Sequence, residues 1–116
     1  MKEIIIRDKS FEFALRIVKL YKYLTLDKKE YVLSKQILKS GTSIGANVEE
    51  AAGGVSKKDF INKLSIAYKE ARETHYWLKL LSGSGYITNK MFDSLEKDCE
   101  ELKKILYTII HKTGNS

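Results

Sequence analysis

The stretch from residue 89 to 111 places apolar side chains alternately three and four positions apart, a spacing that a helix gathers on one face. This seam consists of Phe92, Leu95, Cys99, Leu102, Leu106 and Ile109. Ile105 and Ile110 widen it, so the helix is expected to touch more than one neighbour. The chain contains no proline, the residue that most often interrupts a helix. We therefore predict an all-α fold.

Three further segments repeat apolar residues at helical spacing, and short polar or glycine-containing segments separate them. The predicted helices cover about residues 9–25, 28–52, 57–82 and 89–111. Because the connections between them are short, neighbouring helices should run antiparallel. The sequence therefore predicts one domain over residues 1–116, an antiparallel up-down four-helix bundle.

The sequence also predicts which face of the first helix is buried and how the helices begin and end. The inward stripe of the first helix is predicted to be Phe11, Ala14, Leu15, Val18, Tyr21 and Leu24. Residues 4–6 are expected to precede that helix, as an extended arm or a cover for one end of the bundle. Asp27 and Glu30 resemble a capping box that begins the second helix. Residues 113–116 are expected to form a frayed tail.

Gly41 and Gly45 lie four positions apart within the predicted second helix, so they share a face. Each glycine costs a helix about 1 kcal/mol relative to alanine, which suggests that close packing compensates for the cost. We expect a trough that another backbone approaches, from the third helix or from a neighbouring subunit. Leucine at position 45 should disrupt packing, whereas alanine at either position should be tolerated far better.

Polar and aromatic side chains near the predicted core require a separate explanation. Asn47 and Glu50 follow the glycine trough, and the third helix carries Glu70, Glu73 and Thr74. Because buried carboxylates need partners, these groups form either an inter-helix network or a subunit or ligand interface. Tyr76 and Trp77 are adjacent, so one of the two rings should remain outside the monomer core. Aromatic residues are common at protein interfaces, which favours self-assembly.

The chain has a net charge of +6, from 21 basic and 15 acidic residues. A basic surplus favours a polyanionic partner such as RNA or DNA. The basic residues are scattered, and solvated helix faces would explain them equally well. The residues predicted to contact phosphates are Lys35, Lys39, Lys57, Lys58 and Arg72.

No pattern in the sequence indicates catalysis, a metal or a cofactor. The histidines His75 and His111 have no ligands at metal-binding spacing, and no phosphate-binding loop is present. Cys99 lies in an apolar seam, where a small buried thiol is the simpler interpretation. Only two residues separate Arg72 from His75, which argues against a helical nuclease. We expect no catalytic residue and no enzyme activity.

The composition also suggests a compartment. No apolar run approaches the ~20 residues that span a bilayer, so no membrane association is expected. A single cysteine fits a reducing environment, and no signal peptide is recognisable. The expected location is the cytoplasm.

Four sequence segments resemble a known family. They are Ser43-Ile44-x-x-Asn47-Val48-x-Glu50, Ser56-x-x-x-Phe60, Ile66-Ala67 with Glu73, and Gly85-Tyr86-Ile87. They are similar to the bacterial four-helix-bundle proteins also called large-subunit ribosomal RNA intervening-sequence proteins. The likeness runs from about Phe11 to Ile110. The structural or interface residues that this pattern and the spacing together suggest are Gly41, Ser43, Gly45, Asn47, Glu50, Glu73 and Trp77.

The family resemblance implies a fold like that of the accessory variability protein of diversity-generating retroelements. It also implies a basic homopentamer, which in the retroelement case binds nucleic acid and a reverse transcriptase. The sequence departs from many members at Lys39, where they have arginine, and lysine cannot hold a phosphate in the two parallel hydrogen bonds that arginine forms. The expected function is a non-catalytic oligomer that binds nucleic acid or a nucleoprotein partner. The alternative is a protein-protein adaptor with no nucleic-acid role.

Overall fold

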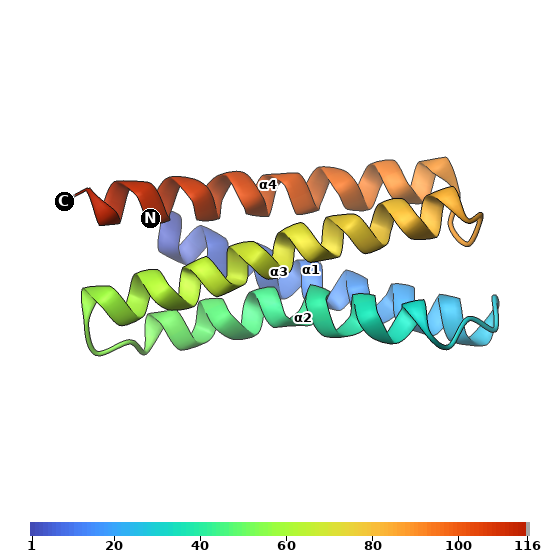
Figure 1. Cartoon of the computed structure of the whole chain (residues 1–116), viewed down its shortest axis with the longest axis horizontal. Coiled ribbons are helices and arrows are strands. Elements are labelled where there is room, and N and C mark those ends of the chain that lie inside the picture. The colour runs from blue at the N-terminus through green and yellow to red at the C-terminus, as the bar shows by residue number, and fades with distance from the viewer. Residues whose placement is uncertain (116) are drawn as a thin grey trace.

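The computed structural model describes residues 1–115, and Ser116, the last residue of the expected tail, lies outside them. Four helices follow one another along the described chain: α1 (Lys2–Leu26), α2 (Leu33–Ala52), α3 (Lys57–Gly83) and α4 (Asn89–Gly114). No strand occurs within residues 1–115, and the helices pack into a bundle of 46 × 21 × 18 Å. Figure 1 shows their up-down arrangement. The prediction of an all-α four-helix fold is confirmed.

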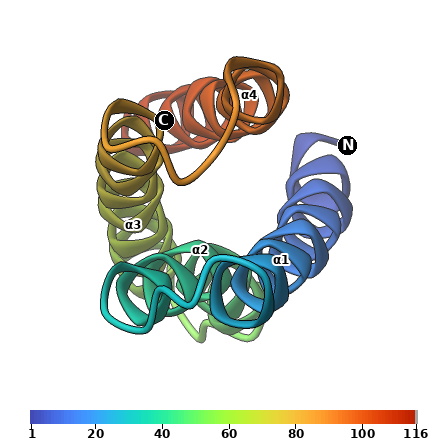
Figure 2. The same ribbon diagram turned by 90° about the vertical axis from the view of Figure 1, so that its right-hand side faces the viewer.

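The bundle is more open on one side. α2 contacts both α1 and α3 extensively, whereas α1 meets α4 over a smaller surface. Figure 2, seen along the bundle, shows α1 and α4 standing apart, whereas α2 lies next to α1. Two ion pairs join these helices, from Lys9 to Glu101 at 3.2 Å and from Arg16 to Asp98 at 2.6 Å.

α1 differs from the expectation in where it starts and in which face it buries. The helix already begins at Lys2, so residues 4–6 belong to it and form no extended arm. Phe11 and Leu15, predicted to point inward, are exposed. Leu24 is buried as predicted, but the rest of the core stripe lies on another face of the helix: Ile6, Phe13, Ile17 and Leu20. This stripe is buried because it continues over more turns than the predicted one and therefore removes more apolar surface from water.

α2 begins at Leu33, later than predicted, because the chain must first turn. Lys29 adopts a left-handed conformation with φ of 55°, which a helix cannot contain. Glu30 then caps the helix by accepting the backbone N–H groups of Val32, Leu33 and Ser34 at 3.2, 3.0 and 2.7 Å. Burial alone would raise the pKa of Glu30, but these hydrogen bonds together lower it.

The glycine trough accepts α1 and neither of the two occupants expected from the sequence, the third helix or a neighbouring subunit. A Cβ atom on Gly41 would lie 2.7 Å from Ile17 Cγ1, and one on Gly45 would lie 3.3 Å from the Ser10 carbonyl oxygen. Ile17 is fully buried, so it has little room to move. The geometry therefore argues against ready tolerance of alanine at Gly41, because the Ile17 side chain fills the space.

α3 and α4 begin close to their predicted starts, where hydroxyl groups cap them. Ser56 accepts the Asp59 N–H and Thr88 accepts the Met91 N–H, both at 3.1 Å. α4 runs on to Gly114, past the predicted end near residue 111. Cys99 is buried within the apolar seam of α4, as its spacing indicated.

Candidate nucleic-acid and subunit interfaces

The outer face of α3 carries a basic stripe. Residues at alternating spacings of four and three share one face of a helix, and seven such positions follow each other here. We call this set the α3 stripe: Lys58, Asn62, Ser65, Lys69, Arg72, Tyr76 and Lys79. All but the half-buried Ser65 are exposed, and none of the seven is acidic. At about 1.5 Å per residue the stripe is ~32 Å long.

The cations of the α3 stripe are not neutralised within the described residues. Elsewhere, Arg7, Lys9, Arg16, Lys63 and Lys103 each pair with a carboxylate of the chain. Across residues 1–115, the structure gives no ion pair or side-chain hydrogen bond to the four α3-stripe cations, Lys58, Lys69, Arg72 and Lys79. These charges are therefore available to an external anion.

The five basic residues predicted from the sequence fall in two places. Lys58 and Arg72 belong to the α3 stripe, and Lys57 lies beside it at the rim of a shallow hollow of about 670 Å³, with Asn62 and Ser65. Lys35 and Lys39 are one turn apart on α2 and are exposed. Burial raises the pKa of the Glu70 carboxyl, and the charge of Glu73 raises it further. The charge of Lys39 lowers that pKa, so Lys39 interacts with Glu70. Part of the Lys39 charge is thus already offset by a carboxylate of the same chain.

The polar residues predicted to link α2 and α3 meet only in part. Glu50 pairs with Lys63 at 2.9 Å, and Thr74 donates to Ser40 at 2.9 Å in the buried interface. Asn47 instead donates to the Ser43 carbonyl of its own helix at 2.8 Å.

Glu73 also stays within its own helix, since it accepts the Trp77 indole N–H at 3.1 Å. Trp77 is half-buried, whereas the neighbouring Tyr76 is exposed, as expected of two adjacent rings. Of the predicted α2–α3 network, the structure therefore keeps the side-chain contacts Glu50–Lys63 and Ser40–Thr74, whereas Asn47 and Glu73 bond within their own helices.

A cluster of charged side chains joins α3 to α4 at His75. Its Nε2 atom lies 2.8 Å from Glu96, and its Nδ1 atom lies 3.1 Å from Glu100 and 3.3 Å from Lys103. Lys103 also pairs with Glu100 at 2.6 Å, and its hydrogen bond lowers the pKa of that carboxyl although burial raises it. Every polar atom of the imidazole thus has a partner within the chain.

The neighbouring Cys99 is similarly unavailable for chemistry. Burial raises the pKa of its thiol to about 12, although the charge of Lys103 opposes the shift. The thiol donates to the Ala71 carbonyl at 3.3 Å. Within residues 1–115, no group of three His, Cys, Asp or Glu side chains is placed to hold a metal ion. None of the described helices has the length and hydrophobicity of a membrane span.

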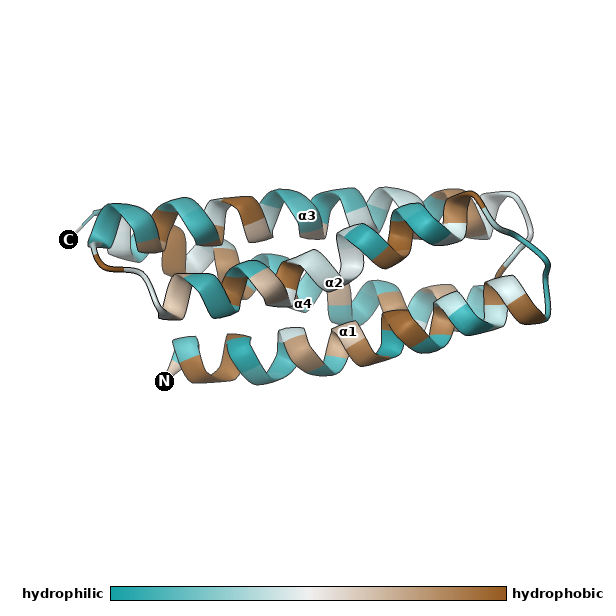
Figure 3. Ribbon diagram, turned by 90° about the horizontal axis from the view of Figure 1, so that it is seen from below, coloured by the Kyte–Doolittle hydropathy of each residue, from teal (hydrophilic) through white to brown (hydrophobic). Residues whose placement is uncertain are grey.

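α1 carries apolar side chains on the face that points away from the core. Ile4, Phe11, Leu15 and Leu26 are 60%, 63%, 56% and 66% exposed. With Asp8, Val18 and Lys22 between them, they form a continuous outer row, which we call the α1 stripe. Figure 3 shows apolar colour recurring along α1. Isolated exposed apolar residues are normal, but four of them in one row along a helix indicate a contact surface.

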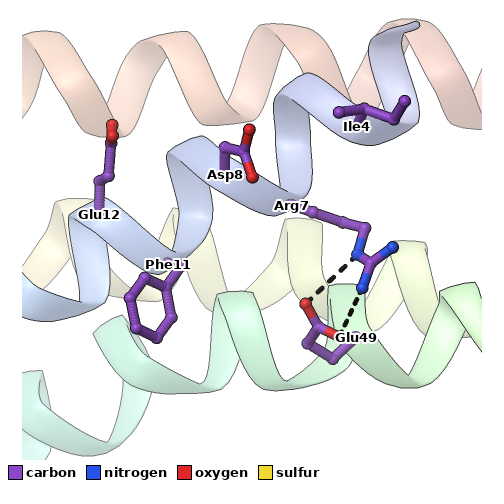
Figure 4. A pocket seen from close by; sticks show the side chains of 6 residues that line it. All are labelled: Ile4, Arg7, Asp8, Phe11, Glu12 and Glu49. Carbon is purple, nitrogen blue, oxygen red and sulfur yellow. Dashed lines mark hydrogen bonds and ion pairs between the residues drawn. The ribbon is translucent and has the colours of Figure 1, made fainter.

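A hollow of about 310 Å³ lies beside Phe11, between α1 and α2 (Figure 4). Arg7 spans its α2 side by donating to both Glu49 oxygens at 3.3 and 3.2 Å. Asp8 and Glu12 line it as well, and the described chain offers neither of them an ion-pair partner. This part of the α1 stripe therefore presents an apolar ring next to free negative charge.

The sequence-based interpretation missed Lys69 and Lys79 and the outer half of α1. The signal for the α3 stripe was available, since its positions repeat at a helical spacing. The signal in α1 was ambiguous, because two apolar stripes compete within one helix and the sequence does not state which one the bundle buries.

Comparison with known proteins gives a consistent result. The model of a family described as 23S rRNA-intervening sequence protein matches residues 2–108. A crystal structure of a protein of unknown function from the S23 ribosomal protein family of Bacteroides thetaiotaomicron is similar in fold, with a TM-score of 0.95. The two sequences are 56% identical, and the match covers 96% of this chain and 99% of the other. No curated protein matches the chain.

Proposed function

The chain belongs to the 23S rRNA-intervening sequence protein family, and from that premise we propose that it is a non-catalytic, self-assembling four-helix protein that binds nucleic acid. The observation that carries the proposal is the α3 stripe, with four cations that no carboxylate of the described chain neutralises. Nucleic-acid phosphates are the polyanion that such a surface fits, because each Lys or Arg can displace condensed counterions.

The expected contact is to the backbone and not to the bases. Lys58, Lys69 and Lys79 are flexible point charges, and Arg72 adds a planar fork that can hold one phosphate in two hydrogen bonds. The neutral residues of the stripe, Asn62 and Ser65, can donate to further phosphate oxygens. Contacts of this kind position a nucleic acid without reading its sequence.

The geometry of His75 supports a non-catalytic role. A general base must reach a substrate proton, but both imidazole nitrogens already contact Glu96, Glu100 or Lys103. This cluster is better suited to holding α3 against α4. We place the protein in the cytoplasm, where a single buried thiol stays reduced.

Self-assembly is the second half of the proposal, and the family resemblance implies five copies. The exposed apolar row of α1 supports a protein contact, because water-exposed apolar surface of this extent is unfavourable in an isolated subunit. A reverse transcriptase or another protein could also use the assembled surface.

The test of nucleic-acid binding is a titration of labelled RNA and DNA duplexes and single strands at two salt concentrations. Binding should weaken steeply as salt rises, because counterion release drives it. An absence of binding even at low salt would overturn the nucleic-acid proposal and favour the adaptor. Light scattering of the purified protein tests assembly separately, and a monomer at micromolar concentration would contradict it.

A further inference from the structure

We propose that the α1 stripe is covered by the α1 stripe of a second copy of this chain, running antiparallel about a two-fold axis at Leu15. The inference rests on the proposed self-assembly and names the surface for one of its contacts. Identical subunits most often associate in this way, with one patch serving both partners.

The apolar residues of the stripe match under this symmetry. A two-fold axis at Leu15 places residues that lie equally far before and after it opposite each other. Leu15 then meets its own copy at the centre, and Ile4 meets Leu26 at each end, since both lie eleven residues from Leu15. Phe11 is placed over the partner's helix next to its Val18 position. All four exposed large apolar side chains of the stripe therefore become covered.

The charges match as well. Along or beside the α1 stripe, the acidic pair Asp8 and Glu12 precedes Leu15, and the basic pair Lys19 and Lys22 follows it. Asp8 and Lys22 lie seven residues on either side of Leu15, so the two-fold operation sets them opposite each other. Glu12 and Lys19 fall one residue from the same relationship. A parallel pairing would instead set like charges side by side.

These four charges are free for such a contact. The cations of α1 that point to other helices, Arg7, Lys9 and Arg16, each pair with a carboxylate. Within the described chain no such partner is given for Asp8, Glu12, Lys19 or Lys22, and all four are exposed. Figure 4 shows Glu12 directed away from the Arg7–Glu49 pair, and no interaction joins Asp8 or Glu12 to that pair. Between residues 7 and 22, the charges on α1 are thus divided into an intramolecular set and a free set that is complementary to itself.

This contact is distinct from the one that closes a ring. A ring is built from head-to-tail contacts between two different patches, whereas an antiparallel α1 pair uses the same patch twice. The α1 contact therefore joins two chains, or two rings, and its disruption should halve the mass of the assembly.

A charge-swap series tests the proposal without touching the core. The double variant Asp8→Lys/Glu12→Lys, and separately Lys19→Glu/Lys22→Glu, should each weaken the two-fold contact about tenfold or more, because four pairs become repulsive. The quadruple variant should restore it, since the charges are again opposite. Sedimentation or light scattering reads the mass, and circular dichroism confirms that each variant keeps its helices.

The possible outcomes distinguish a failure of self-assembly from a failure of the α1 contact alone. A wild-type protein that is monomeric would contradict self-assembly itself. An oligomer that all three variants leave unchanged would contradict only the α1 contact. Weakening by both doubles without rescue by the quadruple would exclude antiparallel self-pairing and indicate a different partner surface.

Cross-linking adds a positional test. Leu15→Cys should join two copies through a short bismaleimide, because the axis brings position 15 against itself. Lys97→Cys, an exposed site on α4, is the matched control and should give little product. The native Cys99 will not interfere, since it is buried. Equal cross-linking at both sites, or none at position 15 in a protein that is oligomeric, would overturn the proposal.

Discussion

Gly41 on α2 and Ile17 on α1 approach so closely that a methyl group on the glycine would lie 2.7 Å from Ile17 Cγ1. Real side chains do not approach at that distance, so the two helices can pack at this separation only because position 41 has no Cβ. The pair fixes the spacing between α1 and α2, which pack against each other more extensively than α1 and α4 do.

Gly41→Ala should therefore destabilise the protein. Overpacking against the fully buried Ile17 costs about 1–3 kcal/mol, and better helix propensity returns about 1 kcal/mol. We expect a net decrease of about 0–2 kcal/mol in the free energy of unfolding, measured by urea denaturation. Gly45→Ala is the matched control: its methyl group would lie 3.3 Å from the Ser10 carbonyl oxygen, so a small shift suffices. Equal stability of the two variants would contradict this account.

Thr74→Val tests the buried hydrogen bond from Thr74 to Ser40. The substitution keeps the shape of the side chain but removes the hydroxyl, which lies 2.9 Å from Ser40 Oγ and 2.8 Å from the Glu70 carbonyl oxygen. The Ser40 hydroxyl then keeps only a long hydrogen bond of 3.5 Å to the Ile37 carbonyl. The expected decrease in stability is about 1–3 kcal/mol. Combined with Ser40→Ala, the decrease should be smaller than the sum of the two single effects, since the unpaired group is gone. Strict additivity in urea denaturation would show that the bond contributes nothing.

Glu30 should make stability depend on pH. Burial raises its pKa, but the three backbone hydrogen bonds favour the charged form, and the folded-state pKa is below the ordinary value of 4.5. Its contribution is therefore complete above pH 4.5 and disappears as the pH falls through the lower folded-state value. Glu30→Gln should cost about 1–3 kcal/mol at about pH 7, and the gap to wild type should close in acid. A gap that stays constant from about pH 7 to about pH 3 would exclude the cap.

The fold was readable from the sequence because apolar periodicity depends only on local spacing. The seam around Cys99 has one stripe and was assigned correctly, whereas α1 has two and was assigned to the wrong face. The choice depends on how much surface the other three helices bury against each stripe, which is a property of the whole bundle. The glycine trough was found for the same local reason, but its occupant was not, since it depends on which helix packs there. Residue type alone identified the basic candidates. Only the structure shows that Lys39 interacts with Glu70, whereas Arg72 has no carboxylate partner within the described residues.

The α3 stripe predicts that nucleic-acid affinity depends on which basic residues are removed and not only on the net charge of the protein. The variant Lys58→Ala/Lys69→Ala/Arg72→Ala should weaken binding to RNA or DNA and should lower the slope of log K against log salt by about one for each phosphate that is no longer neutralised. The control is Lys90→Ala/Lys97→Ala/Lys104→Ala, which removes the same net charge from exposed positions seven residues apart on α4. On that face Asp93 and Glu101 interleave with the lysines, so phosphate gains little there. If both triple variants reduce affinity equally, binding depends on the net charge of +6 and not on the α3 stripe. A larger reduction for the α3 variant would locate the interface on that helix.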